Sequence, residues 1–210
     1  MPSKDSGKTN KDKKIFPIVK LIGGVLIIVA LFIPLKTYSP VLKAEINYQL
    51  NKKNTQNVNN KPVEVIPVDS NFSIIIPKIN ANAKVIRNVN PYDSKNYQKA
   101  LTQGVAHASG SATPDQNGNV FIFAHSATNW YQANQYNAVF YLLNKLEKGD
   151  TLTLYFENTP YNYSVDEIKF VKASEVDYLS NNLNTNSLTL MTCWPPGTTL
   201  KRLIVVATKK

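Results

Sequence analysis

The sequence predicts a mostly β protein, a closed barrel or a sandwich of seven or eight strands with few helices. Short segments rich in β-branched and aromatic residues recur over roughly 140 residues, separated by clusters of Pro, Gly and Asn. Strong helical spacing occurs once, where Val139, Leu142, Leu143 and Leu146 fall at i, i+3, i+4 and i+7. No internal repeat and no glycine-rich phosphate loop interrupts this pattern.

The expected strands follow from apolar alternation and from the turn residues between them. Pro77 lies inside the first strand and indicates an edge or a bulge, because proline lacks the donor of a sheet hydrogen bond. A helical turn is expected at 97–101, and Asn158-Thr159-Pro160 is expected to form the turn of a hairpin. The predicted strands are 72–79, 83–89, 104–108, 119–124, 151–156, 161–166 with a continuation over 168–171, 187–192 and 202–207.

The N-terminal part predicts a membrane anchor. Residues 15–35 are apolar except for Lys20, and about 20 such residues span a hydrocarbon core of roughly 30 Å. Lysines concentrate in residues 1–14, so the positive-inside rule predicts a cytoplasmic N-terminus and an extracellular C-terminal domain. A cleaved signal peptide is the competing interpretation, but bulky residues follow the apolar run and favour an uncleaved anchor.

The sequence between the anchor and the strands predicts a polar stalk over residues 36–71. Its middle is dominated by Asn, Lys and Gln, and it cannot bury enough apolar surface to order itself. Residues 42–50 could extend as a short helix, and Pro62 and Pro67 stiffen the remainder. The predicted folded domain is therefore 72–210.

Charge and ligand patterns exclude several classes of protein. The formal net charge is +10, but the lysines are scattered rather than arranged in an Arg/Lys stripe with aromatics, so we expect no nucleic-acid partner. No CxxC or HExxH spacing predicts a metal site, and we expect no cofactor. Surface carboxylates such as Glu157, Asp166 and Glu167 lack the spacing of a calcium loop.

The only cysteine is the strongest candidate for chemistry. Cys193 follows the strand 187–192, and a short connection through Pro195-Pro196-Gly197 leads to the strand 202–207. If the two strands are antiparallel neighbours, Cys193 and Arg202 share one rim of the sheet. A lone cysteine is often a small buried apolar residue, but an unpaired thiol is a liability outside the cytoplasm.

Arg202 is one of two arginines beside 22 lysines. In so lysine-rich a chain a retained arginine is informative, because lysine cannot reproduce its planar set of donors.

A nucleophilic cysteine needs a base or a charge partner, and the chain offers two histidines. His125 ends the apolar strand 119–124, where a side chain emerges at a rim. His107 lies within the weaker strand 104–108. Either could be structural, and His125 is the better candidate by position.

These residues resemble the sortases, the membrane-anchored cysteine transpeptidases of bacterial surfaces. Residues 189–193 read Thr-Leu-Met-Thr-Cys, which is similar to the TLxTC signature of the family, and Lys201-Arg202 opens the last strand. Residues 118–125 resemble the histidine segment, and Gly149-Asp150 fits the step from a helix into the next strand. Many relatives have Gly-His-Arg where this chain has Ala-His-Ser, so the subclass and the sorting motif stay open.

The resemblance implies a closed seven- or eight-stranded sortase-like barrel with one or two short helices, and it implies roles for three residues. Cys193 would attack a backbone carbonyl, His125 would be its charge partner and general acid, and Arg202 would donate to the oxyanion or the substrate backbone. We also expect Thr192 and Trp194, which flank the cysteine, to contact substrate.

The implied partners are a secreted protein with a C-terminal sorting signal and an amine on a wall peptide or a pilin lysine. Two other functions stay open. The first is a hydrolytic cysteine peptidase, although the order of His before Cys contradicts papain-like enzymes and the caspase signature is absent. The second is a non-catalytic surface β-barrel that binds wall polymer.

Overall fold

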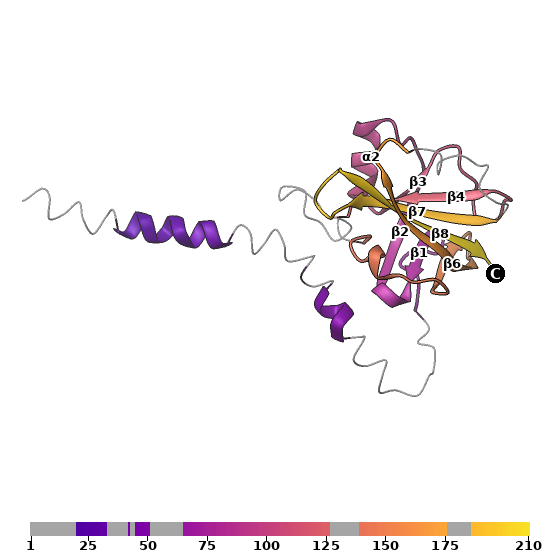
Figure 1. Ribbon diagram of the computed structural model, residues 1–210, viewed down its shortest axis with the longest axis horizontal. Helices are drawn as coiled ribbons and strands as arrows, with labels where there is room; N and C mark the ends of the chain where they lie inside the picture. Colours follow the sequence, from indigo (N-terminus) through magenta and orange to yellow (C-terminus); the bar gives the residue numbers. More distant parts are fainter. Residues whose placement is uncertain (1–19, 33–41, 43–44, 51–64, 127–138, 176–185) are drawn as a thin grey trace, which may run out of the picture. The chain divides into compact units, whose positions relative to one another are not determined.

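Eight strands form a closed barrel in the computed structural model, which describes residues 20–32, 42, 45–50, 65–126, 139–175 and 186–210 (Figure 1). The order around the barrel is β1-β2-β3-β4-β7-β8-β6-β5. The strands are β1 Phe72–Ile76, β2 Ala81–Val89, β3 Val105–Ala108, β4 Asn119–Phe123, β5 Thr151–Phe156, β6 Thr159–Lys172, β7 Ser187–Trp194 and β8 Lys201–Lys209. The predicted mostly β fold is confirmed, and the barrel is the eight-stranded alternative.

Closure of the barrel changes the expected role of Pro77. A closed barrel has no edge strand, and Pro77 instead ends β1 by starting the 3₁₀ turn η1, Pro77–Ile79. Proline suits the first position of a helix because a backbone N–H at that position would have no partner within the helix. The expectation of an edge or a bulge inside β1 was therefore wrong, and the strand ends at Ile76, three residues before its predicted end at residue 79.

The hairpin between β5 and β6 is confirmed, with its turn shifted by one residue. Glu157 and Asn158 both have positive φ angles, of 49° and 65°. This conformation matches a two-residue turn, the shortest connection between antiparallel strands. Thr159 and Pro160 already pair with Phe156 and Tyr155, so they belong to β6 rather than to the turn.

The predicted amphipathic helix is only partly within the described residues, because 127–138 lie outside them. In its described part, turns lead into the 3₁₀ helix η3, Leu143–Lys145, and no α-helix forms. The apolar spacing still marks buried residues, since Leu142, Leu143 and Leu146 all join the core. Spacing of i and i+3 suits a 3₁₀ turn as well as an α-helix, which explains why the sequence pattern misled.

The short helix α2, Ser94–Leu101, is longer than the helical turn expected at 97–101. Asp93 caps its start by accepting a hydrogen bond from the backbone of Asn96. Ala100 and Leu101 are buried at its other end, and the helix contacts β2 and β3. It therefore lies against the barrel at a fixed position.

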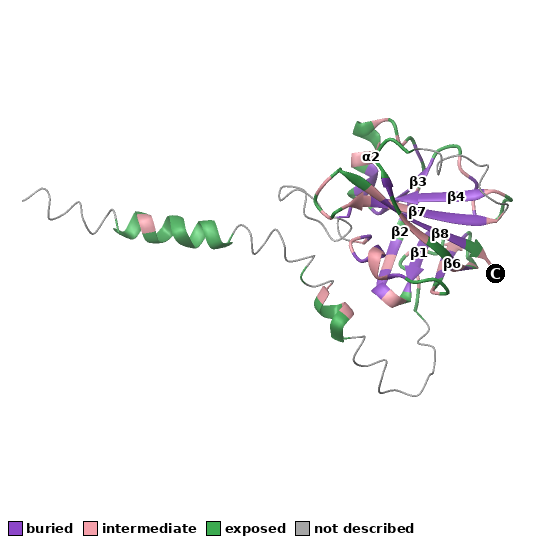
Figure 2. Cartoon of the chain, in the orientation of Figure 1, coloured by how far each residue is buried: buried purple, intermediate pink, exposed green. Residues whose placement is uncertain are grey.

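The core fills the inside of the barrel, and most of β4 and β7 is buried (Figure 2). On β7 the side chains of Leu188 and Leu190 face inward, opposite Ala207 and Val205 of β8. Side chains alternate between the two faces of a strand. The intervening positions therefore point outward, and the functional candidates lie on that outer face.

The N-terminal part of the chain is described only in pieces. Residues 20–32 and 45–50 are helical, and the second of these confirms part of the helix expected over 42–50. The helices of the described ranges include none with the length and apolarity needed to span a membrane. Residues 1–14, the ends of the expected anchor 15–35 and most of the expected stalk lie outside the described residues.

The last residues of the expected stalk contact the barrel. The side-chain amide of Asn82 on β2 accepts a hydrogen bond from the backbone of Val68 at 3.1 Å and donates one to the carbonyl of Ile66 at 2.8 Å. Asp69 forms an ion pair of 2.8 Å with Lys84 on the same strand. The chain therefore enters β1 from a fixed direction.

Candidate active site

Three neighbouring strands bring the predicted site residues together. Cys193 on β7 is the direct partner of Arg202 on β8. On the other side β7 runs parallel to β4, and their last paired residues are Phe123 and Met191. The backbone of Ala124 continues this pairing by donating to the carbonyl of Met191 at 3.1 Å. Extending this register by two residues puts His125 level with Cys193.

The three side chains share the outer face of the barrel. Ala124, Thr192 and Leu203, the residues beside them in the chain, are buried. Because side chains alternate along a strand, His125, Cys193 and Arg202 point the other way, and each is only half-buried. The structure therefore places a free thiol, an imidazole and a guanidinium in one row on an accessible surface.

Thr192 connects the two strands that carry the thiol and the imidazole. Its side chain is 2% exposed, and its hydroxyl donates a 2.9 Å hydrogen bond to the carbonyl of Ala124. That carbonyl directly precedes His125. Thr192, which we expected to contact substrate, thus uses its hydroxyl to connect β7 with the residue before His125.

Trp194 is half-buried next to the cysteine, and its ring lies 5.2 Å from that of Phe170 on β6. Phe170 is 51% exposed. The two rings form an apolar surface at the same end of the barrel as Cys193. The sequence analysis did not identify Phe170 as a site residue, since only the pairing of β6 with β8 brings it there.

Arg202 is held by backbone carbonyls. Its Nη1 donates hydrogen bonds of 3.1 Å to the carbonyl of Thr199 in the β7–β8 connection and to that of Lys201, the first residue of β8. Both acceptors are neutral carbonyl groups, and the Arg202 side chain is half-exposed. The guanidinium therefore has further N–H donors that can bind another oxygen atom.

His125 has one described hydrogen bond, between its Nε2 and Oε1 of Gln98 on α2, at 3.1 Å. Burial lowers the pKa of His125 below its ordinary value of 6.5, because the charged imidazolium loses solvation. Gln98 was missed by the sequence analysis, and no pattern in the sequence could have identified it, since it is 27 residues before His125 on another element.

His107 has the surroundings of a structural histidine. It is 4% exposed, and its Nδ1 accepts a 3.3 Å hydrogen bond from the backbone of Asn88. Nε2 therefore carries the proton, and it lies 2.9 Å from the carbonyl of Ala112 and from Oγ of Ser111. Burial lowers the pKa of His107, the hydrogen bond to Ala112 opposes this, and the charge of Arg87 adds to the lowering.

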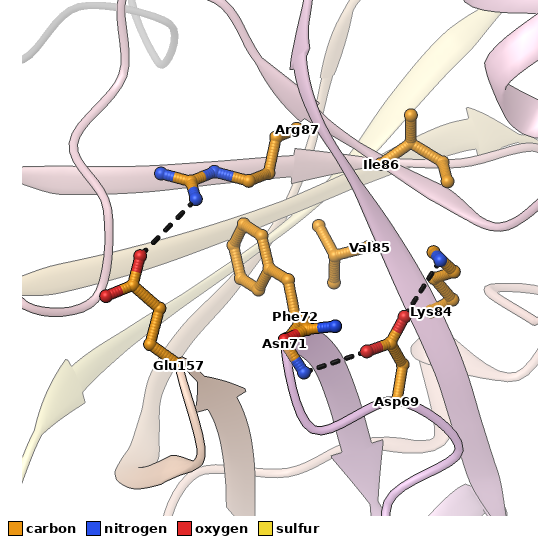
Figure 3. A pocket seen from close by; sticks show the side chains of 8 residues that line it. All are labelled: Asp69, Asn71, Phe72, Lys84, Val85, Ile86, Arg87 and Glu157. Carbon is orange, nitrogen blue, oxygen red and sulfur yellow. Dashed lines mark hydrogen bonds and ion pairs between the residues drawn. The ribbon is translucent and has the colours of Figure 1, made fainter.

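A pocket of about 420 Å³ lies elsewhere on the barrel, between the start of β1, the middle of β2 and the β5–β6 turn (Figure 3). An ion pair borders it on each side, Asp69 with Lys84 and Arg87 with Glu157. The guanidinium of Arg87 also lies over the ring of Phe156, 4.7 Å from its centre. The second arginine of the chain thus has a structural environment, and no predicted site residue lines this pocket.

The described residues contain no group of three or more His, Cys, Asp and Glu side chains that could hold a metal ion. The three carboxylates considered for calcium have other partners. Glu157 pairs with Arg87, Asp166 accepts from the hydroxyl of Thr208, and Glu167 forms an ion pair with Lys169.

The Sortase domain model matches residues 74–210, which is more than half of the chain. The chain belongs to the sortase family. The match begins within β1 and includes every later strand, so it covers the whole row of His125, Cys193 and Arg202.

Individual relatives agree with this assignment. Sortase D of Bacillus subtilis (strain 168) is 29% identical over 133 residues, which cover 62% of this chain and 59% of that protein. Sortase A from Corynebacterium diphtheriae is 26% identical, with a TM-score of 0.56 over 66% of this chain and 60% of that one. This sortase therefore spans less than two thirds of the length of both proteins.

A third relative is matched over most of its length. The X-ray structure of Clostridium perfringens sortase C with the C-terminal cell wall sorting motif is 26% identical and has a TM-score of 0.56. The likeness covers 82% of this chain and 88% of that one. The sortase-like barrel expected from the sequence is confirmed.

We expect the two histidines of this sortase to differ sharply in their effect on stability. His107→Ala leaves the backbone groups of Asn88 and Ala112 without their partner and opens a cavity, so the free energy of unfolding should fall by about 2–4 kcal/mol. His125→Ala at the half-exposed rim should lower it by less than about 1 kcal/mol. Urea unfolding of the two variants measures both values, and equal losses would contradict the assignment of His107 as structural.

The free energy of unfolding should also depend on pH, in a direction that the pKa of His107 determines. The folded-state pKa of His107 is lower than its ordinary value of 6.5, so below pH 6.5 the unfolded chain binds this proton more readily. The stability that His107 contributes is therefore complete above pH 6.5 and decreases as the pH falls toward the folded-state pKa. Unfolding of His107→Gln should show a weaker decrease over this range than the natural chain.

Proposed function

We propose that this chain is a cysteine transpeptidase that cleaves a sorting motif near the C-terminus of secreted proteins and transfers them to an amine on the cell surface. The observation that carries the proposal is the row of His125, Cys193 and Arg202 on three adjacent strands. Membership of the sortase family supports the same reaction class.

The first half-reaction forms a thioester. The thiolate Sγ of Cys193 attacks the carbonyl carbon of the scissile peptide bond, and the carbonyl oxygen becomes an oxyanion. The carbon–nitrogen bond then breaks, and the imidazolium of His125 gives its proton to the leaving amine. Burial lowers the pKa of His125, so its imidazolium is a stronger acid than a solvated one and releases this proton readily.

The second half-reaction consumes the thioester. A neutral amine attacks its carbonyl carbon, His125 accepts a proton from the attacking nitrogen, and the thiolate of Cys193 leaves as the new amide forms. If water attacks in place of the amine, the product is a carboxylic acid and the enzyme acts as a peptidase. The two outcomes use the same residues and differ only in the nucleophile that reaches the thioester.

Arg202 is proposed to stabilise the oxyanion or the substrate backbone. A substrate carbonyl would replace one of the two backbone carbonyls that now accept from its Nη1. Fixed donors directed at a developing negative charge lower the barrier, because they need no reorganisation during the reaction. The planar guanidinium suits this task better than a mobile ammonium.

Trp194 follows Cys193 directly in the chain and is half-buried, and we propose that it contacts the substrate at this end of the barrel. The solved Clostridium perfringens sortase C contains a C-terminal cell wall sorting motif, and its likeness to this chain supports a sorting signal as the substrate. The accepting amine belongs to a wall peptide or to a pilin lysine.

We further propose that residues 15–35 anchor the enzyme in the cell membrane, with residues 1–14 in the cytoplasm, 36–71 as a stalk and 72–210 as the extracellular catalytic domain. The apolar run and the lysines before it support this topology. An anchored enzyme meets secreted substrates as they leave the membrane.

Cys193→Ala is expected to abolish thioester formation while leaving the fold intact, because a half-exposed thiol at the rim contributes little to the core. The assay incubates the protein with peptides that match the C-termini of surface proteins encoded near its gene, and measures the acyl-enzyme by mass spectrometry. A mass gain in Cys193→Ala equal to that of the natural chain would exclude Cys193 as the nucleophile. A chain that stays unmodified by every peptide and keeps an unreactive thiol would favour a non-catalytic binding protein.

Arg202→Lys is expected to lower kcat/KM by at least about a hundredfold, because an ammonium keeps the charge and loses the directed donors. Alkylation of Cys193 by a small uncharged reagent should change only a few-fold, since it needs no oxyanion stabilisation. Arg87→Lys, at the other arginine, is the matched control and should leave both rates unchanged. Equal losses in both assays would mean that Arg202 acts on the thiol, and full activity would make it a surface residue.

The proposed topology is tested by tags and proteolysis. Protease added to intact cells should cleave within 36–71, and a tag at the N-terminus should stay protected. The N-terminus of the mature chain should lie before residue 15. A mature N-terminus beyond residue 35 would show that the apolar run is a cleaved signal peptide.

A further inference from the structure

The helix α2 delivers one polar side chain to the proposed site. Tyr97 packs edge to face on Phe123 of β4, with 6.3 Å between the ring centres and an angle of 78°. Phe123 points to the outer face, as His125 does two residues later. The contact therefore fixes α2 against this face, and it places the next residue, Gln98, within hydrogen-bond distance of the His125 ring.

The hydrogen bond to Gln98 decides which nitrogen of His125 carries a proton. Oε1 of Gln98 is a carbonyl oxygen and can only accept. Nε2 of His125, at 3.1 Å from it, therefore donates and is protonated. In the neutral ring the proton is then absent from Nδ1. Nδ1 has no hydrogen-bond partner among the residues that the structure describes.

This arrangement suits a group that must both give and take a proton. In the neutral ring Nδ1 holds a lone pair that can accept a proton, and in the imidazolium it can donate one. The bond from Nε2 to Gln98 persists in both states, so the ring need not reorient between them. A carboxylate in the place of Gln98 would hold the proton more strongly and weaken the acid.

The groups around the imidazole add no comparable interaction. From α2 the charged and titratable groups are Lys95, Tyr97 and Lys99, with Asp93 at its cap, and from β7 and β8 they are Cys193 and Arg202. Of the described residues, none forms an ion pair with His125, and burial is the cause of its lowered pKa. Among the described residues, Gln98 is thus the polar group that forms a hydrogen bond with this ring.

We propose that Gln98 is a positioning residue that holds His125 as its Nε2–H tautomer, so that Nδ1 exchanges the proton with the reacting atoms at Cys193. The part of this proposal that concerns catalysis rests on the proposed transpeptidase function. The part that concerns the tautomer does not, and it can be measured without any substrate.

The tautomer is tested by long-range ¹H–¹⁵N correlation spectra of the full chain above pH 7.5. The chain has two histidines, and His107 serves as an internal reference because its environment also fixes the Nε2–H form. We expect His125 to show the Nε2–H pattern, and Gln98→Leu to convert it to a mixture of tautomers with His107 unchanged. An Nδ1–H pattern in the natural chain, or an unchanged His125 in Gln98→Leu, would overturn the proposal.

A second variant keeps the shape and changes the charge. In Gln98→Glu the carboxylate should raise the pKa of His125 by one unit or more, measured by titration of its ring signals, and should move the corresponding limb of the kcat/KM profile to higher pH. Gln98→Leu should reduce kcat about three- to tenfold with little change in KM, as expected for one lost neutral hydrogen bond.

Gln103 provides the matched control, because it is an exposed glutamine two residues beyond the end of α2. Gln103→Leu and Gln103→Glu should leave the tautomer, the pKa of His125 and the pH profile unchanged. Equal shifts in the Gln98 and Gln103 variants would show a general effect of charge or of helix stability, and would overturn the proposal. If no peptide forms a thioester with the natural chain, the proposed function fails, and the ring spectra still decide whether Gln98 sets the tautomer.

Discussion

The parallel pairing of β4 with β7 is the constraint on which the proposed site depends. These strands are 68 residues apart in the chain, and only their register brings His125 level with Cys193. Buried polar contacts fix that register. Oδ1 of Asn119 accepts hydrogen bonds from Ser187 at 3.0 Å and from Thr189 at 2.9 Å, and Thr192 bonds to Ala124 at the other end. A shift by one residue would leave these hydroxyls unpaired and turn Cys193 into the core.

The barrel separates the residues that stabilise it from the residues proposed to react. Its interior is filled by inward side chains such as Leu190 and Val205, and burial of these apolar groups supplies the driving force for folding. Cys193 and Arg202 occupy alternate positions of the same strands and face outward. Rigid strands therefore carry the reactive groups, while the β7–β8 connection, which now holds the Arg202 guanidinium, provides acceptors that a substrate can replace.

The two histidines show how the surroundings assign different tasks to one residue type. Burial lowers the pKa of both rings. The ring of His107 bonds through both nitrogens, to Asn88 and Ala112, which locks it in one neutral state. Among the described residues the ring of His125 is bonded on one side only, to Gln98, which leaves its other nitrogen without a partner there. A ring bonded on both sides supports the fold, whereas a ring bonded on one side can exchange a proton.

The sequence by itself determined the strands and the candidates for chemistry. Alternating apolar residues indicate a strand because this pattern depends only on residues that are close in the chain. A single cysteine, two histidines and two arginines leave few choices for a nucleophile and its partners. The short connection between β7 and β8 allowed antiparallel pairing of these strands, and their register confirms it. The Thr-Leu-Met-Thr-Cys segment then indicated the family.

The tertiary structure decided what depends on contacts between distant segments. The parallel β4–β7 pairing, the inward direction of Thr192 and the position of Phe170 beside Trp194 have no local signal. Gln98 is one glutamine among several until α2 packs on β4 and places its carbonyl against His125. Local residue patterns record which segments can form strands. Only the closed barrel fixes which strands become neighbours, and hence which side chains meet.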